Sequence, residues 1–395
     1  SKDDDSKKIT VWAWDESFNG LAMEKAQKIY GDSVKVNFVE MAKADCLKKI
    51  HTYLASGVTK DLPEIVAISD LAAQGYVMSY PGAFMPMDDI INYDDFAKYK
   101  KAQVSYDGVG YGVPFDTGVA GLFYRADYMK EIGYSKEDMK NLTWDEYMSI
   151  GKKLKKKGHL LQTYNPNDIS EFQIMLQSSG TWFTDGDGKA DFVNNKSLKE
   201  CFSIFKTLNE SDYCKTVSDW TEFVGAINGG DVACVIRGSW ISSSIMQAQD
   251  QSGKWAVAPV PKLSVDGATN KSNQGGSSWY VLNKSVNADL AARFLAKTFS
   301  GSRELYNELL TANIMGTYLP AQDVEAYEKS QEFYGGQKLN SDLVSWLAEI
   351  PAVNVGAYST EAQTALTGVT PQFLSGQKLD SCLKKAQEQY EQLTK

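Results

Sequence analysis

The chain has 395 residues and a mass of 43.7 kDa, which is enough for roughly two to three domains and a large buried core. Hydrophobic residues make up 43% and charged residues 23%, a composition that excludes wholesale disorder, a collagen-like repeat and a coiled coil. The net charge of −9 at pH 7 argues against nucleic acid as a partner, because the phosphate backbone attracts basic surfaces.

The first part of the chain alternates strand and helix patterns. Its polar opening, residues 1–7, has nothing to bury and is expected to form a flexible tether. Strands are then expected at 9–14, 34–38 and 65–68, and helices at 21–30 and 42–55. This β-α-β-α-β order predicts the α/β class with a largely parallel sheet.

Polar and aromatic side chains follow each of these three strands. In open α/β sheets, ligands bind in the crevice beyond the carboxyl ends of the strands. The side chains at these ends are Trp14, Asp15, Glu16, Glu40, Lys43, Ser69 and Asp70. Three such clusters at successive strand ends indicate a ligand site at this edge of the sheet.

A second series of strands and helices begins near Gly121. Before it, the glycines within 106–112 fail the spacing of a dinucleotide loop and are more typical of a hairpin turn. Helices are expected at 143–157, with Thr143 as N-cap, at 169–178, and at 379–393, where apolar residues form one stripe.

The motifs of the common enzyme classes are absent: there is no P-loop, no G-x-S-x-G elbow and no H-E-x-x-H. Neither His51 nor His159 lies near a nucleophile motif. Residues 185–191 begin like a calcium loop, but Lys189 and Ala190 replace a ligand position and the required glycine, so a polar turn is expected. The sequence therefore predicts no metal site and no cofactor.

Aromatic residues are unusually frequent at 12%, with 9 Trp and 21 Tyr against only 2 His. Such an excess fits either an aromatic core or surfaces that stack on flat ligands. Several tryptophans stand beside polar or Gly-Ser segments that are expected to be loops, and together these favour ligand stacking. They are Trp14, Trp182, Trp220, Trp240 and Trp279.

The five cysteines include no C-x-x-C pair, so a disulfide scaffold is not indicated. Cys201 and Cys214 would pair only if the geometry allowed it. No apolar stretch is long enough to span a membrane.

A set of short motifs runs in order along most of the chain. They are ITVWAWD at 9–15, LPEIVAISD at 62–70, YGVPFD at 111–116, GLFYR at 121–125, LTWDE at 142–146, IRGSW at 236–240, WYVL at 279–282 and YLP at 318–320. In this order and spacing they resemble the extracellular solute-binding proteins of bacterial ABC importers, in the oligosaccharide-binding group that includes maltose-binding protein. KITVWAWD and SYPGAF are most similar to the sugar binders of Gram-positive bacteria.

This resemblance implies a two-lobed, type II periplasmic-binding-protein-like fold with a ligand cleft between the lobes. The N-terminal lobe is expected at 8–113 plus 264–315, and the C-terminal lobe at 114–263 plus 316–395. The implied protein is a monomer and not an enzyme. It closes on an oligosaccharide and delivers it to the membrane permease of an ABC transporter. It is expected outside the cell, lipid-anchored at the surface through a residue before Ser1.

The resemblance also implies the residues that contact the ligand. Trp240 matches a stacking tryptophan and Tyr358 matches an aromatic residue of the C-terminal lobe, whereas Trp279 falls near a crossing segment and fits hinge packing as well. The remaining expected ligand-binding residues are Trp14, Asp15, Glu16, Lys43, Asp70, Asp116, Asn167, Asp168 and Trp220.

Two other functions stay open at this point. Two of the carboxylates Asp15, Glu16, Asp70 and Asp116 would suit a carbohydrate-active hydrolase, because glycosidases work with a pair of Asp or Glu residues. A solute-binding protein of the same fold would also serve a non-sugar ligand, such as a peptide, a polyamine or a phosphate ester.

Overall fold

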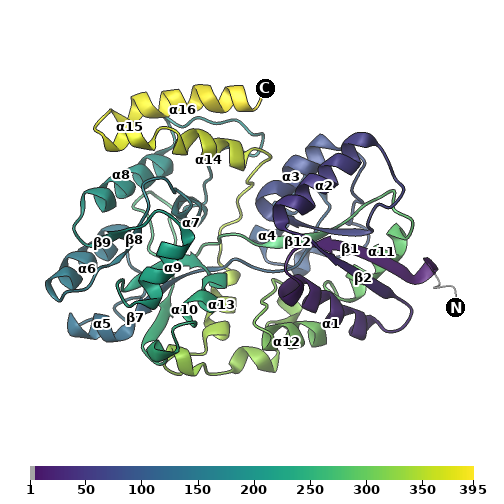
Figure 1. Ribbon diagram of the computed structural model, residues 1–395, viewed down its shortest axis with the longest axis horizontal. Coiled ribbons are helices and arrows are strands. Elements are labelled where there is room, and N and C mark those ends of the chain that lie inside the picture. The colour runs from purple at the N-terminus through teal and green to yellow at the C-terminus, as the bar shows by residue number, and fades with distance from the viewer. Residues whose placement is uncertain (1–4) are drawn as a thin grey trace. The chain divides into compact units, whose positions relative to one another are not determined.

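The computed structural model describes residues 5–395 and divides the chain into two compact units. Unit 1 contains Ser1–Thr117 and Gly275–Glu328, and unit 2 contains Gly118–Gln274 and Lys329–Lys395. Each unit has its own sheet and its own helices (Figure 1). Within residues 5–395, no helix has both the length and the apolar composition that crossing a membrane requires.

The unit boundaries differ from the expected lobe boundaries by several residues. Residues 264–274 belong to unit 2, where the Ala120 amide donates to the Ser272 carbonyl at 2.9 Å. Residues 316–328 belong to unit 1, where the Ala97 amide donates to the Thr317 carbonyl at 3.2 Å. Backbone pairing with distant segments sets these boundaries, and local sequence does not encode it.

The expected tether at 1–7 lies partly outside the described residues, which begin at Asp5. Asp5–Lys7 form a short 3-10 helix, and the Asn287 side-chain amide donates to the carbonyls of Asp5 and Lys8 at 2.7 and 2.8 Å. The prediction of a tether is wrong for Asp5–Lys7, because these bonds attach that turn to unit 1.

Unit 1 is built on a five-stranded sheet with the order β2-β1-β3-β12-β6. The strands are β1 (Lys8–Ala13), β2 (Lys35–Glu40), β3 (Ile65–Ser69), β6 (Val113–Pro114) and β12 (Ser277–Val281). β1 runs parallel to β2 and β3, whereas β12 runs antiparallel to β3 and β6. The three predicted strands and their parallel pairing are confirmed, and β12 makes the sheet mixed.

Helices cover both faces of this sheet because its strands alternate apolar side chains to either side. α2 and α3 pack on the face that bears Trp12, Val66 and Ile68, whereas α1 and α12 lie on the opposite face (Figure 1). The helices of unit 1 are α1 (Leu21–Tyr30), α2 (Lys43–Ser56), α3 (Asp70–Ser79), α4 (Lys98–Gln103), α11 (Ala288–Lys297) and α12 (Arg303–Thr311).

Unit 2 contains a three-stranded antiparallel sheet with the order β10-β7-β11 and a parallel pair, β8 and β9. The strands are β7 (Ala120–Arg125), β8 (Gln162–Tyr164), β9 (Cys214–Thr216), β10 (Cys234–Gly238) and β11 (Trp255–Ala258). The helices are α5 (Ala126–Glu131), α6 (Trp144–Lys156), α7 (Glu171–Ser178), α8 (Lys196–Glu210), α9 (Trp220–Asn228), α10 (Ser242–Ile245), α13 (Leu339–Leu347), α14 (Ser359–Thr367), α15 (Thr370–Leu374) and α16 (Leu379–Leu393).

Two sequence signals of unit 2 are confirmed. Thr143 caps α6 in a capping box, because its hydroxyl accepts from the Glu146 amide at 3.1 Å while the Glu146 carboxylate accepts from the Thr143 amide at 3.2 Å. The apolar stripe of α16 is buried at Leu383, Ala386 and Tyr390, whereas Leu393 at its end is 46% exposed. α16 lies along α14 (Figure 1).

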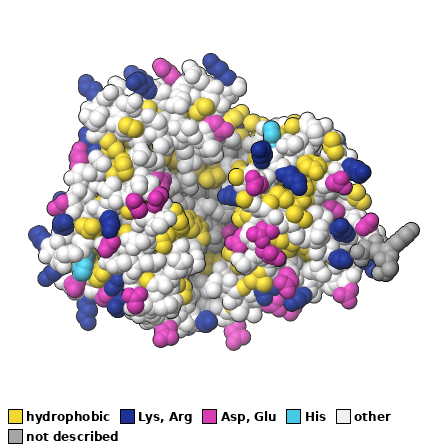
Figure 2. Space-filling model, viewed as in Figure 1, with side chains coloured by type: hydrophobic (Ala, Val, Ile, Leu, Met, Phe, Trp, Pro, Cys, Tyr) yellow, Lys and Arg dark blue, Asp and Glu magenta, His cyan; other side chains and the backbone are white. Residues whose placement is uncertain are grey.

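Basic and acidic side chains are interspersed over the face shown in Figure 2, without a continuous basic patch. All five cysteines are free thiols, including Cys201 and Cys214, and every one of them except Cys214 is buried.

Candidate ligand-binding site

The sheet of unit 1 brings the predicted polar residues to one edge. Ala13 at the end of β1 lies opposite Glu40 at the end of β2, and β3 runs in the same direction. β12 runs in the opposite direction, so its first residue, Ser277, pairs with Ser69 at the end of β3. The loops after β1, β2, β3 and β6 therefore start at a common edge, as expected from the strand order.

Trp14 and Lys43, which follow different strands, come together at this edge. The Lys43 ammonium lies 5.3 Å from the centroid of the Trp14 ring. The indole is half-buried and the lysine is exposed. The pair offers a ligand an aromatic face beside a cation that can donate hydrogen bonds.

Asp15 adopts a backbone conformation that few non-glycine residues use, with φ of 55°. Its carbonyl accepts from the amides of Phe18 and Asn19 at 3.1 and 2.8 Å, which starts the short helical segment Glu16–Gly20. One oxygen of its carboxylate accepts from the Ser17 hydroxyl at 2.7 Å. Asp15 and Glu16 are both exposed, so this turn presents two carboxylates to solvent.

Asp116 follows β6 and is half-buried. Its Oδ1 accepts from both the backbone amide and the hydroxyl of Ser277, each at 2.7 Å. Two hydrogen bonds to one oxygen fix the plane of the carboxylate.

The expectation that Asp70 contacts the ligand is contradicted by its burial. Asp70 is 1% exposed, and its two oxygens accept from the Lys100 ammonium at 2.5 Å and from the Ser278 hydroxyl at 2.9 Å. Burial raises the pKa of Asp70, and the Lys100 charge opposes that effect. Asp70 is the counter-ion of a buried lysine.

Trp279 is also a packing residue, which is the second of the two roles its position suggested. It is 0% exposed, and its ring lies 4.8 Å from that of Phe115 and 5.6 Å from that of Phe299. The interpretation of Trp279 as a stacking platform is therefore wrong.

In unit 2, Trp220 and Trp240 form an exposed aromatic pair. Their side chains are 53% and 45% exposed, and their ring centroids lie 6.2 Å apart. Trp220 is the first residue of α9, which Asp219 caps, and Trp240 follows β10. Two large indole faces left in solvent at adjacent loops are unusual unless they bind something.

Gly238 in the IRGSW motif makes the position of Trp240 possible. A Cβ at this residue would lie 2.3 Å from Nε1 of Trp240 and 2.6 Å from the Gln274 carbonyl. That indole nitrogen donates to the same carbonyl at 2.9 Å. Glycine is therefore required for the bond that orients the exposed indole.

Arg237 and Phe223 lie beside this aromatic pair and were not among the site residues expected from the sequence. The Arg237 guanidinium lies 4.9 Å from the centroid of the Phe223 ring, and the Phe223 ring lies 5.1 Å from that of Trp220. Arg237 is also 3.7 Å from the Glu171 carboxylate. Burial raises the pKa of Glu171, and the Arg237 charge opposes part of that effect. Arg237 stands three residues before Trp240 in the IRGSW motif, and that position was the one sequence feature that could have indicated it as a site residue.

Asn167 and Asp168 lie exposed in the loop between β8 and α7, as expected. The Asp168 carboxylate accepts from the backbone amide of Ser170 at 2.8 Å. The backbone amide of Asn167 donates to the side-chain oxygen of Asn165 at 3.0 Å. These bonds give the loop a defined shape while both side chains stay accessible.

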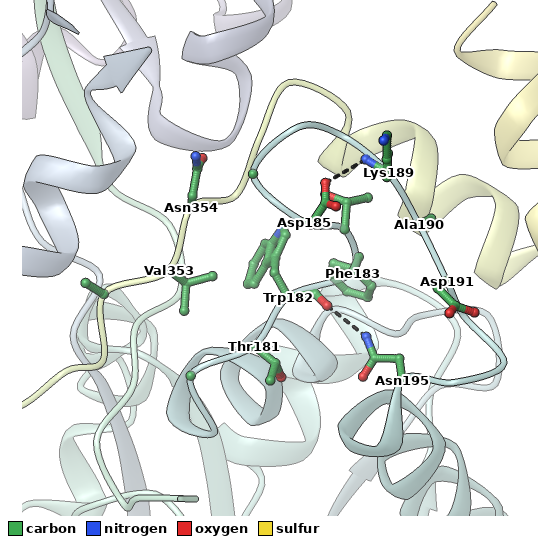
Figure 3. Close-up of a pocket in the computed structure, with 14 residues that line it drawn as sticks. Thr181, Trp182, Phe183, Asp185, Lys189, Ala190, Asp191, Asn195, Val353 and Asn354 are labelled. Carbon is green, nitrogen blue, oxygen red and sulfur yellow. Dashed lines mark hydrogen bonds between the residues drawn. The ribbon is translucent and has the colours of Figure 1, made fainter. Parts of the chain in front are cut away.

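Tyr358 is half-buried at the N-terminal end of α14, close to a hollow of about 760 Å³ in unit 2. The hollow is lined by the loop around Asp185 and by residues 352–354 (Figure 3). A Cβ on Gly188 of that loop would lie 2.8 Å from the Tyr358 ring, so the loop packs closely on this aromatic residue.

The segment that resembles a calcium loop is a polar turn. The Asp185 carboxylate accepts from the Lys189 amide at 2.9 Å (Figure 3). It also accepts from the Asp187 amide at 3.0 Å. Trp182, beside it, is 5% exposed and donates to the Ser359 hydroxyl at 2.8 Å, so it anchors α14. In the described part of the chain, no group of three or more His, Cys, Asp or Glu side chains is placed to hold a metal ion.

Both histidines make local contacts outside these clusters. His51 on α2 bonds to the Tyr80 hydroxyl, whereas His159 bonds to Glu131 and stacks on Tyr128 at a centroid distance of 3.8 Å.

The chain matches the family model of bacterial extracellular solute-binding proteins over residues 22–332. It is also 40% identical over 386 residues to the lactose-binding protein of Rhizobium radiobacter, a match that covers 96% of this chain and 92% of that protein. The chain belongs to the bacterial extracellular solute-binding proteins. The resemblance inferred from the motifs is therefore confirmed.

Solved structures share the fold of this solute-binding protein. An extracellular solute-binding protein of family 1 matches with a TM-score of 0.81 at 17% identity, over 98% of this chain and 100% of the other. An ABC transporter associated binding protein from B. animalis subsp. lactis Bl-04, in complex with beta-1,6-galactobiose, matches with a TM-score of 0.74 at 20% identity, over 98% and 96% of the chains. The predicted two-lobed α/β fold is confirmed.

Proposed function

We propose that this solute-binding protein is a receptor for a short oligosaccharide, which it delivers to the permease of an ABC importer. The exposed pair Trp220 and Trp240 is the observation that carries the proposal. The C–H faces of a sugar ring pack on indole rings, and ring hydroxyls suit carboxylates such as Asp15 and Asp116.

The relatives narrow the first ligands to test. The protein from Rhizobium radiobacter is a lactose-binding protein, and the structure from B. animalis subsp. lactis holds beta-1,6-galactobiose. We therefore propose a disaccharide or short oligosaccharide of this kind as ligand, with Trp14, Asp15, Glu16, Lys43, Asp116, Asn167, Asp168, Trp220, Trp240 and Tyr358 as contact residues.

The family is bacterial and extracellular, and its members are binding proteins. We propose in addition that this protein works as a monomer, breaks no bond in its ligand and is tethered to the cell surface by a lipid anchor. Unchanged lactose after prolonged incubation, measured by chromatography, would support a role without catalysis.

The direct test is a calorimetric screen of the purified chain. The panel contains lactose, beta-1,6-galactobiose, arabino-oligosaccharides and maltodextrins, with a polyamine and a peptide as non-sugar probes. We expect one sugar class to bind and to change the tryptophan fluorescence. A flat response to every sugar by folded protein would refute the proposal, and binding of the polyamine or the peptide alone would replace the ligand class.

Trp240→Ala then tests the site itself. Loss of one stacking face should weaken sugar binding by about 1–3 kcal/mol without changing the fold. Circular dichroism and thermal unfolding provide the control. Unchanged affinity would remove Trp240 from the site.

A further inference from the structure

Lys100, on α4, is the most completely buried charged residue among those described, with 0% exposure. Lysine is almost never fully buried unless its charge is paired. Nothing in the sequence pattern assigned it a role. Its surroundings explain why a lysine stands here.

The Lys100 ammonium donates three hydrogen bonds to three segments of unit 1. They go to Oδ2 of Asp70 at 2.5 Å, to the Asp116 carbonyl at 2.6 Å and to the Ser277 carbonyl at 2.8 Å. An ammonium group has three donors, so all of them are used. A neutral side chain cannot reproduce this set.

The backbone around the ammonium is shaped to allow these bonds. Gly276 has φ of +106°, and a Cβ at this position would lie 2.8 Å from Asp70 Oδ2 and 3.2 Å from the Lys100 nitrogen. Glycine therefore lets the β12 end of the chain approach the buried ion pair.

The two residues whose carbonyls Lys100 binds are joined a second time. Asp116 accepts through Oδ1 from the amide and the hydroxyl of Ser277. Lys100 fixes the backbone of both residues, and the half-buried Asp116 carboxylate belongs to the same junction. The junction therefore sets the direction of that carboxylate.

We propose that Lys100 is a positioning residue for ligand binding: by tying the backbone of Asp116 to that of Ser277, it orients the Asp116 carboxylate toward the sugar hydroxyls. The inference rests on the proposed function, since it requires Asp116 to contact the ligand. Lys100 is fully buried and does not touch the ligand itself.

A double-mutant cycle separates positioning from general stabilisation. The probe is the strongest binder among lactose, beta-1,6-galactobiose, arabino-oligosaccharides and maltodextrins, titrated by calorimetry into the full chain. Lys100→Gln should weaken binding about tenfold or more in the wild-type background, on the scale of a lost hydrogen bond to a charged group, and less than about twofold in the Asp116→Ala background.

Controls keep the outcomes distinct. Lys101→Gln alters the neighbouring lysine, which is exposed and paired with Asp94, and should leave affinity unchanged. If Lys100→Gln does not fold, Lys100→Met with Asp70→Leu replaces the buried ion pair by apolar groups, a change that proteins often tolerate. That variant should show the same loss of affinity and the same dependence on Asp116.

Two results would overturn the inference while leaving the proposed function standing. One is an equal loss of affinity with and without the Asp116 carboxylate. The other is unchanged affinity in a folded Lys100 variant. If no sugar of the panel binds the folded wild type, the proposed function fails first and the positioning role fails with it.

Discussion

Glu64 gives unit 1 a stability that depends on pH. It precedes β3, is 6% exposed, and its amide donates to the Thr10 carbonyl at 3.0 Å. Burial raises the pKa of its carboxyl from 4.5 to about 7, although a backbone hydrogen bond from Thr10 and the charge of Lys8 lower it. Glu64 lies at the amino end of β3, whereas the candidate site residues follow the carboxyl ends of the strands.

The sign follows from which state holds the proton. Between pH 4.5 and 7 the folded protein keeps Glu64 protonated while the unfolded chain has released the proton. The stabilisation is complete below pH 4.5 and is lost as the pH rises through about 7. The difference between the folded and unfolded pKa values limits the contribution of Glu64 to the free energy of unfolding to about 3 kcal/mol. Solvent screening reduces this contribution to about 1–2 kcal/mol.

Glu64→Gln replaces the carboxyl by a neutral group that does not titrate. Relative to wild type, the variant should have nearly the same free energy of unfolding at pH 4.5 and be more stable by about 1–2 kcal/mol at pH 8. Urea unfolding of both proteins across this range measures the difference. The exposed Glu24→Gln serves as control, with an expected effect below about 0.5 kcal/mol at every pH. A difference that is constant, or larger at low pH, would refute the reasoning.

Two further substitutions separate the exposed from the buried aromatic residues. Gly238→Ala should displace the Trp240 indole and weaken sugar binding by about 1–3 kcal/mol. The added Cβ also meets the Gln274 carbonyl, so the unfolding temperature should fall as well. Calorimetry that finds wild-type affinity would contradict this packing argument. Trp279→Ala should instead cost about 3–5 kcal/mol of unfolding free energy in denaturant titration, because it empties a core site, and a loss below 1 kcal/mol would argue against its burial.

Much of unit 1 could be predicted because its signals are local. The apolar runs and the order of elements predict β1, β2 and β3, and parallel pairing then brings Trp14 and Lys43 to one edge. The same pattern could not separate Asp15 from Asp70. Both follow a strand, but a lysine thirty positions along the chain buries Asp70 in an ion pair.

The aromatic residues show the same limit. Trp240 and Trp279 both follow short polar segments, yet one is 45% exposed and the other is 0% exposed. The difference in exposure depends on which side chains pack against each tryptophan. Phe115 and Phe299 cover Trp279, whereas Gly238 and Gln274 orient Trp240 toward solvent. Such contacts form between distant segments, so composition and spacing do not reveal them.

Because its native cysteines are buried or have a raised pKa, this protein is suitable for conversion into an optical sensor. Cys46, Cys201, Cys234 and Cys382 are buried, and burial raises the pKa of Cys46 and of the partly buried Cys214 to about 11. A thiol reacts with maleimide dyes as its thiolate. Buried cysteines with a raised pKa rarely form the thiolate at neutral pH. A single cysteine engineered at an exposed position can therefore carry an environment-sensitive fluorophore, while the native cysteines stay in place.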